Sequence, residues 1–147
     1  MLIMRTAHLL SAALLLAASS VAAEAQYDPW QHFGSIFILT DPEGANLPGT
    51  ATEKDFPLLV RLHRDFFDFH QAKADGADIR FSTGAGIPLR FQIEEWDAAN
   101  GMASIWVRIP VIRGNARQEL RMHWGQPDAA SESSGRAVFS EDNGFLY

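Results

Sequence analysis

The chain has 147 residues, of which 47% are hydrophobic and 20% charged, so it suits one ordinary globular domain and is not a disordered acidic tail. It carries 12 Lys+Arg against 18 Asp+Glu, and the formal net charge of -6 repels phosphate backbones, which argues against a nucleic-acid partner. It has no cysteine, which excludes a disulfide scaffold, a thiolate zinc site, a cysteine nucleophile and an acylated lipoprotein anchor.

The first 25 residues have the pattern of a secretory signal peptide. Arg5 precedes the apolar run Leu9–Ala18, and small residues follow with Ala-x-Ala at Ala23 and Ala25. The apolar run is shorter than the roughly 20 residues that a membrane-spanning helix needs. We therefore expect cleavage before Gln26 and a periplasmic or secreted mature chain without a membrane span.

Apolar and polar residues alternate with the two-residue period of a β-strand along residues 26–139. In Gln118–Trp124, for example, Leu120, Met122 and Trp124 are expected to face inward, and Glu119, Arg121 and His123 to face outward. The same argument predicts six strands, at Phe33–Thr40, Phe56–His63, Ile79–Ser82, Leu89–Glu94, Met102–Pro110 and Gln118–Trp124. Ala137–Phe139 is a candidate seventh strand.

Turn-forming residues separate these strands. Thr83–Gly86 and Asp97–Gly101 are short enough to close hairpins, and Asp65–Ala74 is the best candidate for a helical turn. Ala129–Gly135 is rich in Ala and Ser, and it is expected to be a mobile loop or linker. Together these elements predict an all-β fold over residues 26–139, an antiparallel β-sandwich that is jelly-roll-like.

An arginine flanked by apolar residues recurs in strand after strand. The members of this pattern are Arg61, Arg80, Arg90, Arg108 and Arg121. The period of two places each one opposite its apolar neighbours, where guanidinium groups could hold an acidic glycan. Because the net charge is negative, we favour a solvated face whose arginines pair with Glu94, Glu119 or Asp residues on adjacent strands.

Tryptophan side chains offer a second kind of candidate site, since aromatic faces stack on sugar rings. Trp124 falls on the inward register and is expected in the core, whereas Trp106 faces a second layer or solvent. Trp96 ends a strand at a turn and is expected to be the more exposed of the candidates. Trp96 and Trp106, with Arg90 and Arg108, are therefore the predicted binding residues.

The sequence gives little support for catalysis or metal binding. Adjacent Glu94 and Glu95 are expected on opposite faces of a strand, where they cannot flank one glycosidic bond. Asp75 and Asp78 are interpreted as turn residues, since two carboxylates do not make a calcium site. The histidines outside the leader lack metal-ligand spacing and are expected mostly at the surface or at strand edges; they are His32, His63, His70 and His123. No catalytic residue, metal or cofactor is predicted.

Seven blocks occur in an order that resembles the bacterial domain of unknown function DUF2341. They are Trp30 before a strand, Asp55–Leu62, Ala74–Phe81, Ile93–Asp97, Ile105–Pro110, His123–Pro127 and Ala137–Phe139. The resemblance covers about Trp30 to Phe139. It departs from the family pattern at Phe33 and Gly34, where a basic residue is common, and at Gln92, where Glu is frequent.

This resemblance implies an exported β-sandwich of the kind that often precedes a concanavalin-like or laminin-G-like lectin module. Some such proteins also carry a proton-channel subunit, and the family supplies no catalytic residue to carry over. Residues 140–147 are then the truncated start of a following segment.

Three functions follow as hypotheses. The first is an exported non-catalytic module that binds a glycan or a protein, or that packs beside a lectin-like domain. The alternative is a structural or assembly domain of an envelope complex associated with a proton-channel-type transport protein. The third is a glycoside hydrolase, which would need two carboxylates roughly 5–10 Å apart in one cleft. The oligomeric state is left open.

Overall fold

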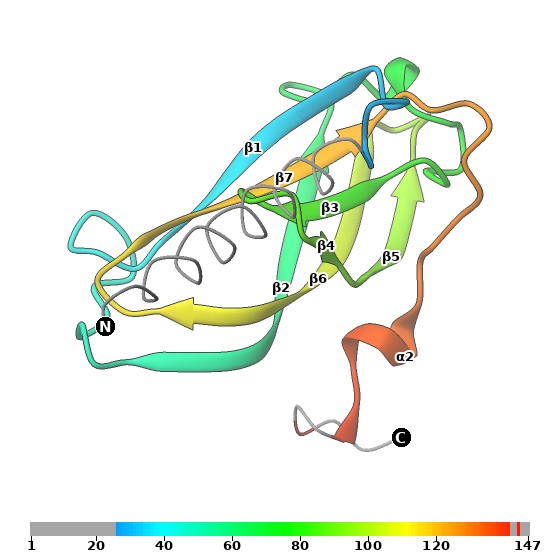
Figure 1. Cartoon of the computed structure of the whole chain (residues 1–147). Coiled ribbons are helices and arrows are strands. Elements are labelled where there is room, and N and C mark those ends of the chain that lie inside the picture. Colours follow the sequence, from blue (N-terminus) through cyan, green and yellow to red (C-terminus); the bar gives the residue numbers. More distant parts are fainter. Residues whose placement is uncertain (1–25, 142–143, 145–147) are drawn as a thin grey trace, which may run out of the picture.

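The computed structural model describes residues 26–141 and 144, which form two antiparallel sheets (Figure 1). The proposed signal peptide lies outside the described residues. The first sheet, sheet A, has the order β1 (His32–Leu39), β7 (Arg117–Trp124), β3 (Arg80–Thr83) and β4 (Pro88–Leu89). The second, sheet B, has the order β2 (Thr52–His63), β6 (Met102–Arg113) and β5 (Phe91–Asp97). The expected β-sandwich is confirmed.

The core between the sheets comes from the inward face of each strand. Ile105, Val107 and Ile109 of β6 are almost fully buried, as their alternation predicts. Leu120 and Met122 of β7 are buried opposite them, and Trp124 packs partly buried against the same core. The two hairpins expected from the turns are also present, since Phe81 of β3 pairs with Leu89 of β4 and Asp97 of β5 pairs with Met102 of β6.

The predicted strand Leu89–Glu94 is in fact two strands in different sheets. The chain leaves sheet A after Leu89 and enters sheet B at Phe91, with exposed Arg90 between them. Leu89 and Phe91 are both buried, so the alternation of apolar and polar residues continues around the corner. The two-residue period of the sequence therefore does not show where the chain passes from one sheet to the other.

Two short helical segments complete the fold. The 3-10 helix η1 (Phe69–Gln71) lies where a helical turn is predicted. The helix α2 (Gly135–Val138) lies where a seventh strand is predicted, so that prediction is wrong. Ala137–Phe139 is too short for its period to separate a strand from one helical turn. A single turn suffices to bury Val138, which has no exposed surface.

A buried carboxylate ties together the loops at one end of the sandwich. Asp78 is fully buried, and its oxygens accept hydrogen bonds from the backbone N–H groups of Lys73 at 2.9 Å, Gly125 at 2.7 Å and Gln126 at 3.2 Å. Asp75 accepts a hydrogen bond from the backbone N–H of Ala77 at 3.0 Å. Both carboxylates thus serve turn structure, as the sequence favours.

The segment Ala129–Gly135 is fastened along its length, which corrects the expectation of a mobile linker. Lys73 Nζ donates to the carbonyl of Ala129 at 2.9 Å, and Arg80 donates to that of Ala130 at 2.6 Å. Further on, Ser133 Oγ and the backbone N–H of Ser134 bond to strand β5. Figure 1 shows this segment running from the end of β7 to α2.

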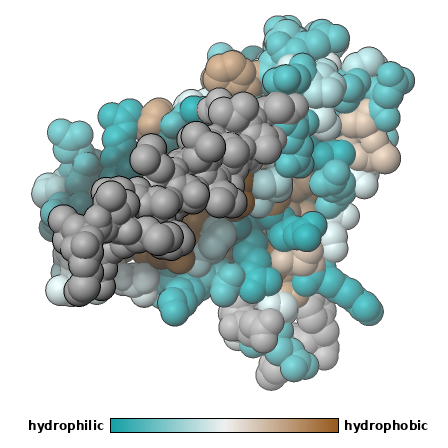
Figure 2. All heavy atoms as spheres, viewed as in Figure 1, coloured by the Kyte–Doolittle hydropathy of each residue, from teal (hydrophilic) through white to brown (hydrophobic). Residues whose placement is uncertain are grey.

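The visible surface of the described residues is mostly hydrophilic, with hydrophobic residues in separate patches (Figure 2). Among the described residues, no helix has the length and apolar character that crossing a membrane requires.

Candidate functional site

Trp96, the residue expected to be the more exposed sugar platform, is instead partly buried and packs against the core. Its ring packs against Phe67 at 6.1 Å and against Phe69 at 5.2 Å between centroids, both in edge-to-face geometry. Gly76 lies directly beside the indole, since a Cβ at that position would come within 2.7 Å of it. The indole nitrogen of Trp96 is buried and has no hydrogen-bond partner among the described residues. Trp96 is therefore not an exposed platform.

The reason is an extra residue in β5. The pairing of β5 with β6 shifts between Ile93 and Glu95, so Glu94 forms a bulge and Trp96 pairs with inward-facing Ala103. Glu95 pairs with Ser104, which lies between two inward residues and therefore faces outward. Glu94 also reaches the outer face, where its Oε2 accepts a hydrogen bond from Trp106 at 3.0 Å. The expectation that Glu94 and Glu95 point to opposite faces is thus wrong.

Trp106 and Arg108 share the outer face of sheet B, where α2 covers them. Trp106 is half-buried, and its ring lies 5.5 Å from that of Phe139 in edge-to-face geometry. Arg108 pairs with Asp55 at 2.9 Å and donates a hydrogen bond to the carbonyl of Ala137 at 3.4 Å. Of the two environments expected for Trp106, the structure thus has the second layer. The structure gives both side chains local partners in the domain.

Arg90 lies at the corner between the sheets and is exposed, while its carbonyl accepts a hydrogen bond from the backbone N–H of Arg108 at 2.9 Å. The recurring arginines do not form one guanidinium face. Arg80 and Arg121 belong to sheet A, whereas Arg61 and Arg108 belong to sheet B. The ion pair of Arg108 with Asp55 of the adjacent strand β2 agrees with the favoured interpretation, whereas Arg121 pairs at 3.2 Å with Glu119 of its own strand.

Arg80 departs from the expected solvated face because the N-terminal segment and residues 129–134 cover it. It is almost fully buried, pairs with Glu132 at 3.2 Å, and lies 5.4 Å from the ring of Trp30. Trp30 in turn donates its indole N–H to the carbonyl of Asp78 at 2.6 Å. The segment just after Gln26 is therefore an integral part of sheet A's outer layer.

His123 is buried on the same outer face, contrary to its expected place at the surface. The ring of Tyr27 stacks on it at 4.0 Å, and Ser82 Oγ lies 3.0 Å from His123 Nε2. Burial, with a smaller effect of Arg121, lowers the pKa of His123 to about 4, so the imidazole is neutral near pH 7. Burial of Tyr27 raises the pKa of its phenol. Because Ser82 and His123 are both buried and the ring of Tyr27 stacks on His123, we assign this Ser–His contact to packing.

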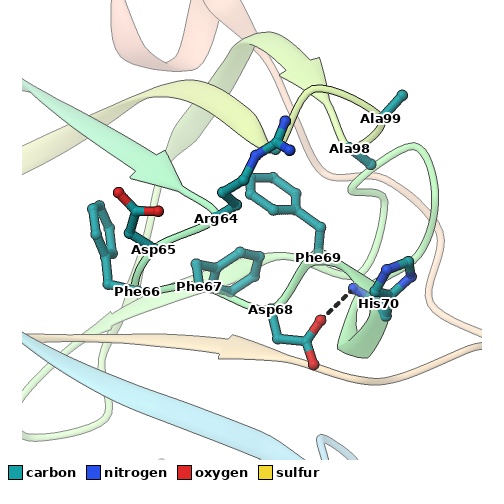
Figure 3. Close-up of a pocket in the computed structure, with 10 residues that line it drawn as sticks. Arg64, Asp65, Phe66, Phe67, Asp68, Phe69, His70, Ala98 and Ala99 are labelled. Carbon is teal, nitrogen blue, oxygen red and sulfur yellow. Dashed lines mark hydrogen bonds between the residues drawn. The ribbon is translucent and has the colours of Figure 1, made fainter.

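A pocket of about 560 Å³ lies at one end of the sandwich, beside residues 64–70 and the turn at 98–101 (Figure 3). Its carboxylates take part in local structure. Asp68 accepts a hydrogen bond from the backbone N–H of His70 at 3.0 Å, and Asp65 Oδ2 lies 3.1 Å from His63 Nδ1. In the part of the chain that the structure describes, no three His, Asp or Glu side chains gather as metal ligands.

An apolar groove lies on the side of the sandwich where β1 and β2 are the outermost strands. We call it the β1–β2 groove; its volume is about 480 Å³, and most of its lining comes from residues 34–38, residues 58–62, Phe66 and Phe67. Opposite this side, the chain itself closes the sandwich by passing from β4 to β5. Met122 and Trp124 also line the groove, which therefore opens onto the core.

Exposed aromatic side chains lie along the outer face of β1 and beside this groove. Phe33 and Phe37 project from β1, with exposed fractions of 67% and 44%, and Phe66 at the end of the groove is 70% exposed. The guanidinium of Arg117 stacks over the ring of Phe37 at 4.0 Å. Clustered aromatic and arginine side chains are typical of protein interfaces rather than of free surface. This aromatic edge of β1, together with the groove, is the candidate functional site.

Sequence analysis missed this site, although part of the signal is present. The residues from Phe33 to Leu39 are mostly apolar, so β1 is apolar on both faces. An ordinary edge strand instead has one apolar face and one polar face exposed to solvent. The sequence pattern does not show that β1 is the edge strand of its sheet. That position depends on pairing with β7, whose residues lie 78 to 92 positions later in the chain than their partners in β1.

Comparison with known families gives one match. A model of DUF2341, described as a domain of unknown function, matches residues 75–145. The match includes five of the seven blocks noted in the sequence and leaves β1 and β2 outside it. Neither the curated proteins nor the solved structures give a match.

Proposed function

Residues 75–145 belong to the DUF2341 family, a domain of unknown function, and from this premise we propose that the chain is an exported, non-catalytic assembly module. Its role is to join another protein by accepting an extended strand at the free edge of β1. The observation that carries this proposal is the edge strand β1 itself, with exposed Phe33 and Phe37 on its outer face and the apolar β1–β2 groove on its inner side.

Strand addition follows from the chemistry of a sheet edge with which no other strand of the described residues pairs. The backbone N–H and C=O groups on the free side of β1 can bond to an incoming strand, which gives affinity independent of sequence. Alternate side chains of that strand face the β1–β2 groove on one side and the exposed aromatic rings on the other. An extended segment with apolar residues at every second position fits both surfaces.

The sugar-binding alternative is weaker because its expected platform is used elsewhere. Trp96 is packed inside the sandwich, and Trp106 is bonded to Glu94 and covered by Phe139. Phe33 and Phe37 are separated along one strand face, and the Arg117 guanidinium covers the ring of Phe37, an arrangement that suits a protein partner better than a sugar ring. Glycan binding is therefore kept as an outcome of the experiment below.

Export is part of the same proposal. A cut before Gln26 leaves Tyr27 and Trp30 in place, and these two residues cover His123 and Arg80. Mass spectrometry of the chain, expressed in a bacterial host from its first residue and recovered from the periplasm, is expected to begin at Gln26. Recovery from the cytoplasm with the leader uncut contradicts export and leaves the assembly role to be judged separately.

Site-specific photo-crosslinking tests the assembly role. A benzoylphenylalanine in place of Phe33 is illuminated in intact cells that produce the full chain, and adducts are identified by mass spectrometry. The matched control carries the same probe in place of Ile87, which is 57% exposed and lies at the opposite side of sheet A, beside β4.

We expect protein adducts from position 33 and none from position 87. Adducts of equal yield from both positions, or none from either, contradict the proposal. A folded chain that gives no protein adduct yet is retained by an immobilised glycan would replace assembly with sugar binding.

A further inference from the structure

We propose that the strand added at β1 is β1 of a second copy of this chain, so that two sheets A join into one continuous sheet. This inference rests on the proposed function and names the partner at that same edge. The pairing is antiparallel and centred on Ser35, with a two-fold axis perpendicular to the sheet. Three observations lead to it: the state of the other edges, the composition of β1, and the symmetry of its outward face.

Three of the four edge strands carry features that discourage pairing with another chain. The strand β4 has only two residues, one of them Pro88. The strand β5 has a bulge, exposed Glu94 and Glu95, and a neighbouring segment that bonds to it. The strand β2 contains charged residues, Pro57, and Asp55 with a φ of 50°. These are the devices by which β-proteins protect their edges.

The remaining edge, β1, has none of these features. Its sequence, HFGSIFIL, is eight residues long and contains no proline and no Asp, Glu, Lys or Arg. Its positions pair regularly with β7 from His32 to Leu39 without a bulge. A long, regular and uncharged edge of this kind is either an aggregation hazard or a surface that pairs in the functional protein.

The outward face of β1 matches itself under a two-fold rotation. Its outward residues are Phe33, Ser35 and Phe37, since these alternate with partly buried Gly34, Ile36 and Ile38. When Ser35 lies opposite Ser35 of the second copy, each Phe33 lies opposite a Phe37. The joined sheet thereby gains two directly opposed aromatic pairs, a favourable arrangement across antiparallel strands.

The same register suits the inward face and the charges near the axis. Gly34 lies opposite Ile36 of the second copy, so a residue without a side chain faces a large one. Beside the axis, Arg121 and Glu119 pair within each copy at 3.2 Å, and Ser35 donates a hydrogen bond to Glu119 at 2.6 Å. Pairing therefore brings no uncompensated charge to the centre.

The two-fold axis also accounts for the β1–β2 groove. An axis perpendicular to sheet A keeps both copies of sheet B on the same side of the joined sheet. The two grooves then open toward each other, and apolar residues such as Leu58 and Phe66 of both copies face a shared space. An isologous contact of this kind closes after two copies, so it does not grow into a filament.

A pair of charge variants of the full chain tests both the dimer and its register. In Phe33→Lys/Phe37→Lys, the register places lysine opposite lysine at both pairs. In Phe33→Lys/Phe37→Glu, it places lysine opposite glutamate. Ile87→Lys, on an exposed apolar residue away from β1, is the matched control. Sedimentation equilibrium measures the dissociation constant, and circular dichroism verifies that each variant has the same β-sheet content.

We expect the unaltered chain and Ile87→Lys to be dimers with the same dissociation constant. Phe33→Lys/Phe37→Lys should raise that constant roughly 100-fold, because two aromatic pairs are lost and like charges replace them. Phe33→Lys/Phe37→Glu should recover most of the loss. A monomeric unaltered chain overturns the inference, as does a Lys/Glu variant that dissociates as readily as the Lys/Lys variant.

The failure of this inference is distinguishable from failure of the assembly role. If the chain is monomeric but the crosslinker at position 33 captures a different protein in cells, the partner named here is wrong and the proposed function stands. If position 33 captures nothing, both fail. Adducts of two identical chains support both.

Discussion

The strands β1 and β5 are both edge strands, but another segment of the chain covers the outer edge of β5 and none of the described residues covers that of β1. Along β5, Ser133 Oγ accepts a hydrogen bond from the backbone N–H of Ile93 at 2.8 Å, and the N–H of Ser134 donates to the carbonyl of Phe91 at 2.9 Å. The segment that supplies these partners ends at α2, on the other side of the view from β1 (Figure 1). Along β1, exposed aromatic residues border an open groove.

This difference shows that the place of an aromatic residue along its strand does not decide its role. Trp96 lies near the end of β5, but the bulge and neighbouring Phe67 and Phe69 make it part of the interior. Phe33 lies near the start of β1 and stays exposed, although it pairs with buried His123 of β7. The covered edge holds the fold together, whereas the bare edge is available to a partner.

The largest expected effect is the loss of stability on truncating the covered tryptophan. Trp96→Ala removes a large ring from between Phe67, Phe69 and Gly76, and we expect the free energy of unfolding to fall by roughly 3–5 kcal/mol. Urea denaturation followed by fluorescence of the remaining tryptophans measures it.

The matched control is Phe33→Ala on the bare edge, measured at a protein concentration low enough to keep the chain monomeric. An exposed substitution of this kind is expected to change the free energy of unfolding by no more than about 0.5 kcal/mol. An equal fall in the free energy of unfolding for the two variants would contradict the view that Trp96 supports the fold whereas Phe33 does not.

The next effect concerns His123, which lies under Tyr27 directly across from Phe33 in the ladder. Because burial lowers its pKa from 6.5 to about 4 in the folded chain, folding favours the neutral imidazole. Its contribution to stability is fully present above pH 6.5 and is lost as the pH falls toward 4. We expect roughly 2–3 kcal/mol to disappear over this range.

His123→Gln keeps a group that can bond to Ser82 but removes the titration. Its free energy of unfolding should therefore depend less steeply on pH between 6.5 and 4 than that of the unaltered chain. Chemical denaturation at four or five pH values in this interval measures both slopes. Parallel slopes would show that the pKa of His123 is not lowered by folding and that Tyr27 does not shield the imidazole from solvent.

Most of the fold could be predicted from sequence because alternation directly encodes which side chains are buried. The inward faces of β6 and β7 follow the predicted residues, and both predicted hairpins form. The errors arise where the local sequence pattern does not determine how distant segments pair. The bulge at Glu94 reverses the faces of the residues after it, and a three-residue apolar segment at Ala137–Phe139 fits a helical turn equally well.

The candidate site could not be predicted in the same way, because an edge is a property of the sheet. Phe33 and Phe37 have the same local pattern as core residues, and only the order β1-β7-β3-β4 leaves them at a border. His123 illustrates the opposite case. Its outward register is predicted, but its burial depends on Tyr27, which lies 96 positions earlier and outside any predicted strand.

The smallest expected effect tests the cover of β5 itself. Ser133→Ala removes the acceptor for the backbone N–H of Ile93. We expect the free energy of unfolding to fall by about 1 kcal/mol and hydrogen exchange at that amide to become roughly fivefold faster.

Ser35→Ala on β1 is the matched change, since Ser35 Oγ bonds only to the exposed carboxylate of Glu119 among the described residues. Because that bond and Arg121 lower the pKa of Glu119, the variant should raise this pKa while stability changes little. If Ser133→Ala leaves exchange at Ile93 unaltered, Ser133 does not protect β5, and the contrast between a covered edge at β5 and a bare edge at β1 loses this support.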